Sequence, residues 1–129
     1  MSRWSASLDR HLDVLSSTHP LSVSDDYRWV EVHNFVLPPG FNSSAIDVLV
    51  DIPEGYPADP PGVEPSRIFL PTHLRYRGRM IKHFHTGITP GWGHWAWFCY
   101  RWIKWNPHKD NLVTFIDMVR AHLTDPATS

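Results

Sequence analysis

The chain has 129 residues and a mass of 14.9 kDa, which is the size of one domain. Its 12 lysines and arginines against 13 aspartates and glutamates give a formal net charge of -1, which argues against general binding to nucleic acid or to an anionic membrane. The apolar fraction of 42% supports a packed core, and a single cysteine excludes an internal disulfide or a cysteine-rich zinc site. We expect one domain over residues 1–129, with a core of about 5–124 and a short C-terminal tail.

No apolar run has the length of a signal peptide or of a membrane span. We therefore expect a cytoplasmic protein that binds no membrane. In that reducing compartment the cysteine stays a free thiol.

Two segments have the apolar spacing of amphipathic helices. Residues 5–16 place Leu8, Leu12 and Leu15 on one face. Residues 111–123 show the same spacing, and Asp110 is a natural N-cap for that second helix.

Between the helices, β-branched and alternating residues favour strands. The strand candidates are residues 27–37, 45–52, 67–70 and 79–86. Strict alternation in the first strand puts Trp29, Glu31, His33 and Phe35 on one face, and a Pro-Gly turn predicts a hairpin with the second strand. The order of elements predicts an α+β fold with a four-stranded antiparallel meander sheet.

Two segments differ from these elements in their composition. Five of the twelve prolines fall within residues 53–65, so this stretch is neither a regular strand nor a helix. Five of the seven tryptophans fall between residues 92 and 105, around Cys99. A cysteine among aromatic residues is either an inert core residue or a nucleophile, and composition alone favours the first reading.

The order of four short motifs resembles the ubiquitin-conjugating enzyme family. Residues 52–61 (Ile-Pro-Glu-Gly-Tyr-Pro-Ala-Asp-Pro-Pro) are similar to its Tyr-Pro-x-x-Pro-Pro signature. Cys99 followed by residues 105–107 (Trp-Asn-Pro) and the helix at 111–123 is similar to its catalytic cysteine, its Trp-Ser-Pro segment and the helix behind the active site. Residues 123–126 are similar to its helix-ending Asp-Pro, so the resemblance covers roughly residues 5–126.

The tryptophan-rich frame and the histidines before the cysteine narrow the resemblance to the divergent prokaryotic family E branch of bacterial ubiquitin-like conjugation operons. The resemblance implies a minimal UBC-like fold with an N-terminal helix, the meander sheet, an active-site loop and one C-terminal helix, without the usual last two helices. It also implies a transferase that accepts a ubiquitin-like protein from a ThiF-like activating enzyme as a Cys99 thioester and passes it to an amine. A JAB-type peptidase from the same operon is a further implied partner, and no cofactor or metal is expected.

The family's His-Pro-Asn tripeptide is replaced in this region by residues 89–91 (Thr-Pro-Gly). A donor is still needed for the oxyanion that develops during amine attack. We therefore expect His83, His85 and His94 to supply the missing polar group beside Cys99.

Two other functions are consistent with the sequence. A non-catalytic UBC-like interaction module would use the fold without the thiol chemistry. A zinc hydrolase would use His83 and His85 together with His94 or His108, although no glutamate lies nearby in the sequence to act as a base. A tryptophan-rich carbohydrate-binding module fits less well, because residues 95–98 are uniformly apolar.

Overall fold

The computed structural model of the protein describes residues 3–63, 66–99 and 104–128. It contains two helices and one antiparallel sheet of six strands in the order β1-β2-β3-β4-β6-β5. The elements are α1 (Ala6–Ser16), β1 (Leu21–Val23), β2 (Trp29–Val36), β3 (Ala45–Asp51), β4 (Ile68–Pro71), β5 (Phe84–His85), β6 (Trp95–Phe98) and α2 (Leu112–His122). Neither helix has the length and apolar character to cross a bilayer, as far as the described ranges extend.

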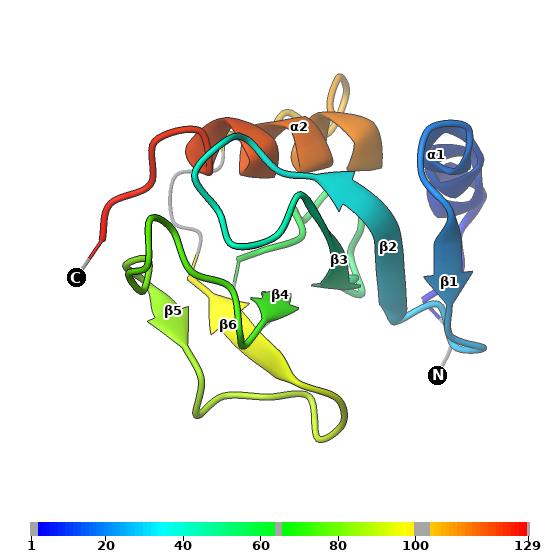
Figure 1. Ribbon diagram of the computed structural model, residues 1–129. Helices are drawn as coiled ribbons and strands as arrows, with labels where there is room; N and C mark the ends of the chain where they lie inside the picture. Colours follow the sequence, from blue (N-terminus) through cyan, green and yellow to red (C-terminus); the bar gives the residue numbers. More distant parts are fainter. Residues whose placement is uncertain (1–2, 64–65, 100–103, 129) are drawn as a thin grey trace.

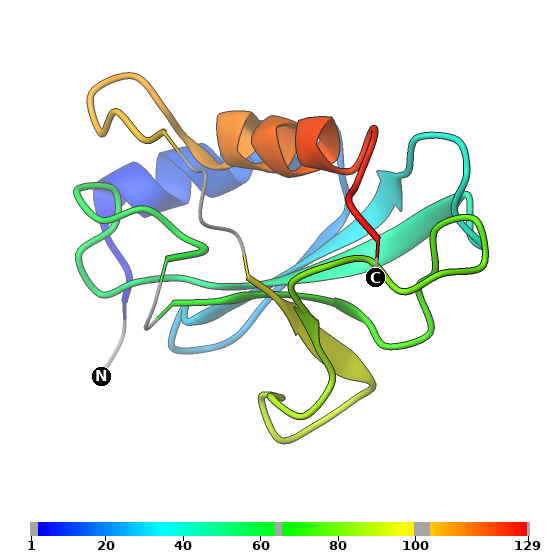
Figure 2. The same cartoon turned by 90° about the vertical axis from the view of Figure 1, so that its left-hand side faces the viewer.

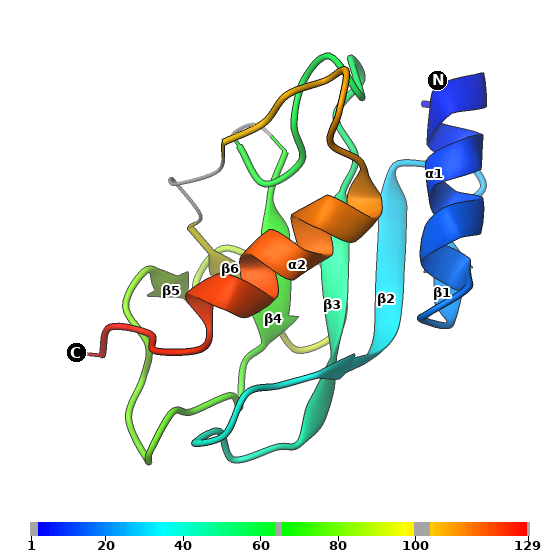
Figure 3. The same ribbon diagram turned by 90° about the horizontal axis from the view of Figure 1, so that it is seen from above.

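Both helices lie on the same side of the sheet, which gives the protein two layers (Figures 1 and 2). Seen from above, α2 runs across the middle strands, and α1 lies along the side of the sheet formed by β1 and β2 (Figure 3). The other face of the sheet carries no helix within the described residues. The α+β class is therefore confirmed, with one face of the sheet covered by the helices.

The two predicted helices are present, and each begins one residue later than expected. Ser5 caps α1 by accepting a hydrogen bond from the Leu8 backbone N–H at 3.1 Å. Asn111, rather than Asp110, caps α2, in a capping box with Thr114. The prediction for Asp110 is wrong because its carboxylate instead accepts the Asn106 backbone N–H at 2.7 Å and closes the preceding turn.

The four-stranded meander is corrected to six strands. β1 is only three residues long, and β6 lies in the uniformly apolar tryptophan segment, where no alternation marks a strand. β6 inserts between β4 and β5, so the last step of the sheet is not a meander. Of the predicted strand at 79–86 only β5 forms, because Tyr76 to Arg79 make a tight turn and His83 has a positive φ of 62°.

A β-bulge in β2 corrects the predicted strict alternation. The register with β3 shifts between Val32 and Phe35, where Asn34 has a φ of 57°. The extra residue reverses the facing of the strand, so Phe35 joins Val32 under the helices instead of sharing the outer face with Glu31. Glu31 and His33 keep the face opposite to the helices, because the facing changes only after His33.

The main core lies between the sheet and the helices. It is centred on fully buried side chains such as Phe35, Leu70 and Phe115. Phe115 of α2 packs against Gly62, where a β-carbon would lie 3.1 Å from the ring, and Gly62 has a φ of 84° that favours glycine. The end of the proline-rich stretch is therefore fitted closely to α2.

Candidate active site around Cys99

Cys99 belongs to a second apolar cluster on the helix-free face of the sheet. Alternate residues of β6 point to opposite sides: Ala96 and Phe98 enter the main core, whereas Trp95, Trp97 and Cys99 face outwards. The outer-face cluster consists of Leu49, Phe69, Trp95, Trp97 and Cys99. Part of the predicted tryptophan frame is thus placed beside Cys99, while Trp102 lies outside the described residues.

The surroundings of Cys99 combine burial with a fixed backbone. Its side chain belongs to the apolar cluster, and the residue is only 5% exposed. Its backbone N–H donates to the His83 carbonyl oxygen at 2.8 Å. Cys99 therefore stands at the end of a paired strand, immediately before residues 100–103, which lie outside the described part of the chain.

His85 lies on the same face as Cys99. It pairs with Trp97 across β5 and β6, and the two rings have centroids 4.9 Å apart with an interplanar angle of 35°. Cys99 is two residues beyond Trp97, so His85 is its diagonal cross-strand neighbour, a relation that places β-carbons roughly 7 to 8 Å apart. The imidazole of His85 is exposed.

The other two predicted histidines are placed differently. His83 stands opposite Cys99 and holds its backbone through the carbonyl, which any residue type supplies. His94 precedes β6 whereas Cys99 follows it, so five steps of extended chain, on the order of 16 Å, separate them. The structure therefore brings His83 and His85 to the cysteine and leaves His94 at the far end of the strand.

The histidine set of the zinc-hydrolase alternative does not assemble. His83, His85, His94 and His108 all lie in described parts of the chain. Within these parts, the only group of metal-ligating side chains close enough to share an ion is Glu31, His33 and Asp47. These three residues are not those of the predicted set.

The two motifs that flank the site contact each other. The Trp105 indole N–H donates to the Pro57 carbonyl oxygen at 2.7 Å, and the Trp105 and Tyr56 rings have centroids 5.9 Å apart. Residues 56–61 and 105–107 are thus joined although they are far apart in the sequence. This contact holds both motifs at the main core.

Tyr56 also ties this region to α1. Its hydroxyl lies 2.6 Å from Nδ1 of His11, and the rings meet edge to face. Burial raises the pKa of Tyr56, and burial followed by the charge of Arg10 lowers the pKa of His11. Both shifts favour a phenol that donates its proton to a neutral imidazole.

The stability of the protein should fall in mild acid because of such histidines. Burial is the main cause that lowers the pKa of His11, His19 and His122. The unfolded chain binds these protons near pH 6.5, before the folded protein does, so stability is complete above that pH and is lost as the pH falls through the lowered values. Urea midpoints at about pH 7.5 and about pH 5.5 measure the effect.

In this test, His11→Gln should reduce the difference between the two midpoints. Asp13→Asn, at an exposed position of the same helix, is the matched control and should leave it unchanged. A midpoint that rises towards pH 5.5 in the unaltered protein contradicts the prediction.

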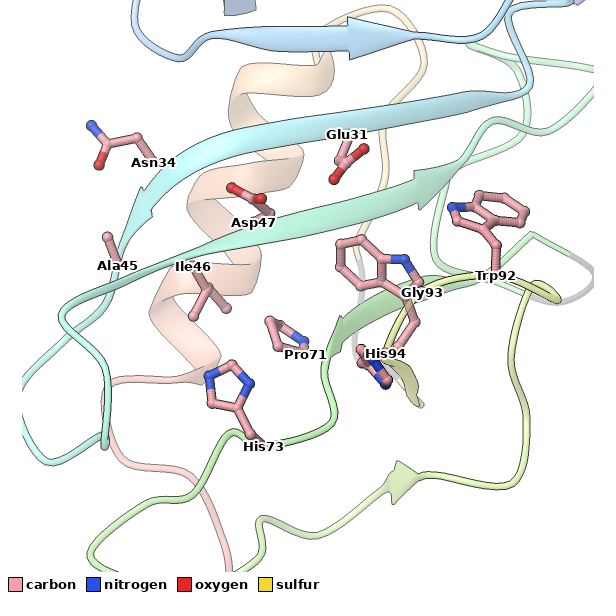
Figure 4. Close-up of a pocket in the computed structure, with 11 residues that line it drawn as sticks. Glu31, Asn34, Ala45, Ile46, Asp47, Pro71, His73, Trp92, Gly93 and His94 are labelled. Atoms are coloured by element: carbon pink, nitrogen blue, oxygen red, sulfur yellow. The ribbon is translucent and has the colours of Figure 1, made fainter.

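A hollow on the outer face was not foreseen from the sequence. It has a volume of about 700 Å³ and lies between β2, β3 and the segment before β6 (Figure 4). Its walls include Glu31, Asp47, His73, Trp92 and His94. The alternation of residues 45–52 does place Asp47 on the outer face, but no local pattern brings His73 or Trp92 to it.

The comparisons with known proteins agree with this architecture. The sequence model of prokaryotic E2 family E matches residues 7–125, which is most of the chain. A search of curated proteins and a search of solved structures each found no match. The match defines the class as E2-like proteins of the ubiquitin-like conjugation systems.

The chain belongs to prokaryotic E2 family E. Membership implies a conjugating transferase in general terms, with a ubiquitin-like protein and an activating enzyme as its kinds of partner. The resemblance predicted from the motifs is thereby confirmed at the level of the family.

Proposed function

We propose that Cys99 accepts the C-terminal carboxyl group of a bacterial ubiquitin-like protein as a thioester and transfers it to an amine. The observation that carries this proposal is the position of the chain's one cysteine. It directly follows β6 and lies six residues before Trp105, which docks on Tyr56 of the proline-rich motif. A mixture of the chain, the ubiquitin-like protein, the activating enzyme and ATP tests it by the appearance of an adduct that thiol reductant removes.

The proposed chemistry has two balanced steps. In the first, the Cys99 thiolate attacks the carbonyl carbon of the thioester on the activating enzyme, a new C–S bond forms and the enzyme's own thiolate leaves. In the second, a neutral amine attacks the same carbon and the C–N bond forms. The C–S bond breaks, the Cys99 thiolate leaves with the electron pair, and the proton of the amine passes to that thiolate or to water. Both steps pass through an oxyanion that a hydrogen-bond donor stabilises.

The partners in this proposal are a ThiF-like activating enzyme, the ubiquitin-like protein and, for release of the product, a JAB-type peptidase of the same operon. Because activation by such an enzyme consumes ATP, the proposal includes a cytoplasmic location for the reaction. The near-neutral charge of the chain supports recognition of protein partners through local surfaces rather than through a strong overall field.

His85 is the histidine best placed to act on the second step. It shares the face of Cys99, is exposed, and is held against the Trp97 ring. His85→Ala should slow discharge to a free amine by roughly 100-fold while changing loading much less, because the lost donor acts on the attack by the amine. Single-turnover discharge of the purified adduct measures this rate.

Matched variants separate catalysis from structure in this experiment. His85→Gln retains a donor and should recover part of the rate. His83→Ala keeps the carbonyl that accepts the Cys99 N–H and should have a smaller effect, and His108→Ala, on an exposed turn, should have none. An equal loss of loading and discharge in His85→Ala overturns the assignment.

A second candidate function is a non-catalytic interaction module of the same fold. The low exposure of Cys99, 5%, favours it, because a thioester carrier must offer its thiol to two partner proteins. The two functions differ in one readout: the module binds the ubiquitin-like protein or the activating enzyme without forming a covalent adduct.

A further inference from the structure

Glu31, His33 and Asp47 form a compact group of metal-ligating side chains on the helix-free face of the sheet. One ligand atom from each lies within 4.8 Å of the others. Glu31 projects from β2 and Asp47 from β3, and the two carboxylates approach each other over the hollow (Figure 4). The group is remote from Cys99 in the sheet order, because β4 and β6 lie beyond β3.

The strand register explains why these three residues meet. Glu31 and His33 are two residues apart and share a face of β2. Val32 pairs with Val48, so Asp47 stands opposite the bulge formed by His33 and Asn34. The bulge ends the regular ladder at this point, a position where strands commonly re-aim a side chain.

The contacts of His33 orient its ring for coordination. Its Nε2 lies 2.7 Å from Ser22 Oγ on β1, and its Nδ1 lies 3.1 Å from an Asp47 carboxylate oxygen. A ring nitrogen fixed by a neighbouring oxygen leaves the other nitrogen directed at the ion in many metal sites. Ser22 therefore holds the His33 ring through Nε2 and leaves Nδ1 for the ion.

The group of Glu31, His33 and Asp47 has more negative than positive charge. Glu31 and Asp47 bring two carboxylates to one imidazole, and among residues 3–63, 66–99 and 104–128 no lysine or arginine forms an ion pair with either. The hollow of about 700 Å³ in front of them leaves space for water or a further ligand, and His73 and His94 stand among its other walls. A divalent cation would neutralise the pair and complete its coordination from the hollow.

We propose that Glu31, His33 and Asp47 bind one divalent first-row transition-metal ion on the outer face of β2 and β3. One nitrogen and two carboxylate oxygens suit zinc and cobalt better than magnesium, which favours an octahedron of oxygens. This site is separate from the thioester chemistry, and its failure would leave the proposed function untouched.

Titration of tag-free, full-length protein with Zn²⁺ or Co²⁺ tests the proposal by calorimetry and by the Co²⁺ absorption spectrum. We expect one ion per chain, with binding weakened at least tenfold by Asp47→Asn, Glu31→Gln or His33→Gln, and weakened less by Ser22→Ala. Asp13→Asn and His108→Gln remove an exposed carboxylate and an exposed imidazole elsewhere, and should bind as the unaltered protein does.

Urea unfolding of each variant without metal shows that the fold is retained. Equal affinity in all variants assigns the ion to other histidines and overturns the site. Absence of uptake at micromolar Zn²⁺ by the folded, unaltered protein overturns it as well.

Discussion

Cys99→Ala should abolish the reductant-sensitive adduct between this chain and its ubiquitin-like partner. The loss should be complete, because no second cysteine exists to replace the sulfur. Cys99→Ser should instead accumulate an adduct that resists thiol reductant and is cleaved by base, because an oxyester reacts more slowly with amines than a thioester does. Gels run with and without reductant, after incubation with the activating enzyme and ATP, distinguish the three proteins.

The burial of Cys99 calls for a control on the fold itself. The change to alanine removes one atom from a side chain packed in the outer-face cluster, so urea unfolding should confirm that Cys99→Ala is folded before its adduct is judged. An adduct that persists in Cys99→Ala excludes the thioester. Binding of both partners by the unaltered protein without any covalent product supports the interaction module instead.

Phe115→Ala should destabilise the protein by about 3 to 5 kcal/mol. Phe115 is fully buried in α2, and its ring fills the space above Gly62 and Ile68. Removing the ring leaves a cavity that Gly62 cannot fill, and the loss is comparable to the whole stability of many domains, about 5 to 15 kcal/mol. The free energy of unfolding from urea titration measures it.

Phe41→Ala is the matched control for this prediction. It deletes the same ring from a half-buried position, where Phe41 packs against Tyr76 with centroids 5.0 Å apart and the rings tilted by 59°. The free energy lost there should be clearly smaller, because less apolar surface returns to water. Similar losses at both positions contradict the view that the contact between α2 and the proline-rich stretch is a main support of the fold.

Much of the architecture could be predicted because it depends on local signals. Both helices follow from leucine or mixed apolar spacing, and the hairpin of β2 and β3 follows from alternation around a Pro-Gly turn. β6 could not be predicted in this way. Its residues are buried on both faces of the sheet, so the segment is uniformly apolar and carries no period of two.

The arrangement of side chains around Cys99 could not be predicted from the sequence. Short motifs pointed to Cys99. The pairing of β5 with β6 brings His85 near Cys99 and leaves His94 at the other end of β6, and it depends on contacts between segments that are distant in the sequence. The prediction that Phe35 shares a face with Glu31 was wrong because of the bulge in β2. A one-residue bulge leaves no mark in the composition of a strand, yet it exchanges the two faces for every residue that follows.

The lengths of the outermost strands bear on how the protein behaves at high concentration. The sheet ends in β1, with three residues, and in β5, with two. Edges this short expose few unpaired backbone groups, so a neighbouring copy finds little on which to add a strand. Short strands at both borders of the sheet therefore disfavour fibril-like assembly through edge-to-edge pairing.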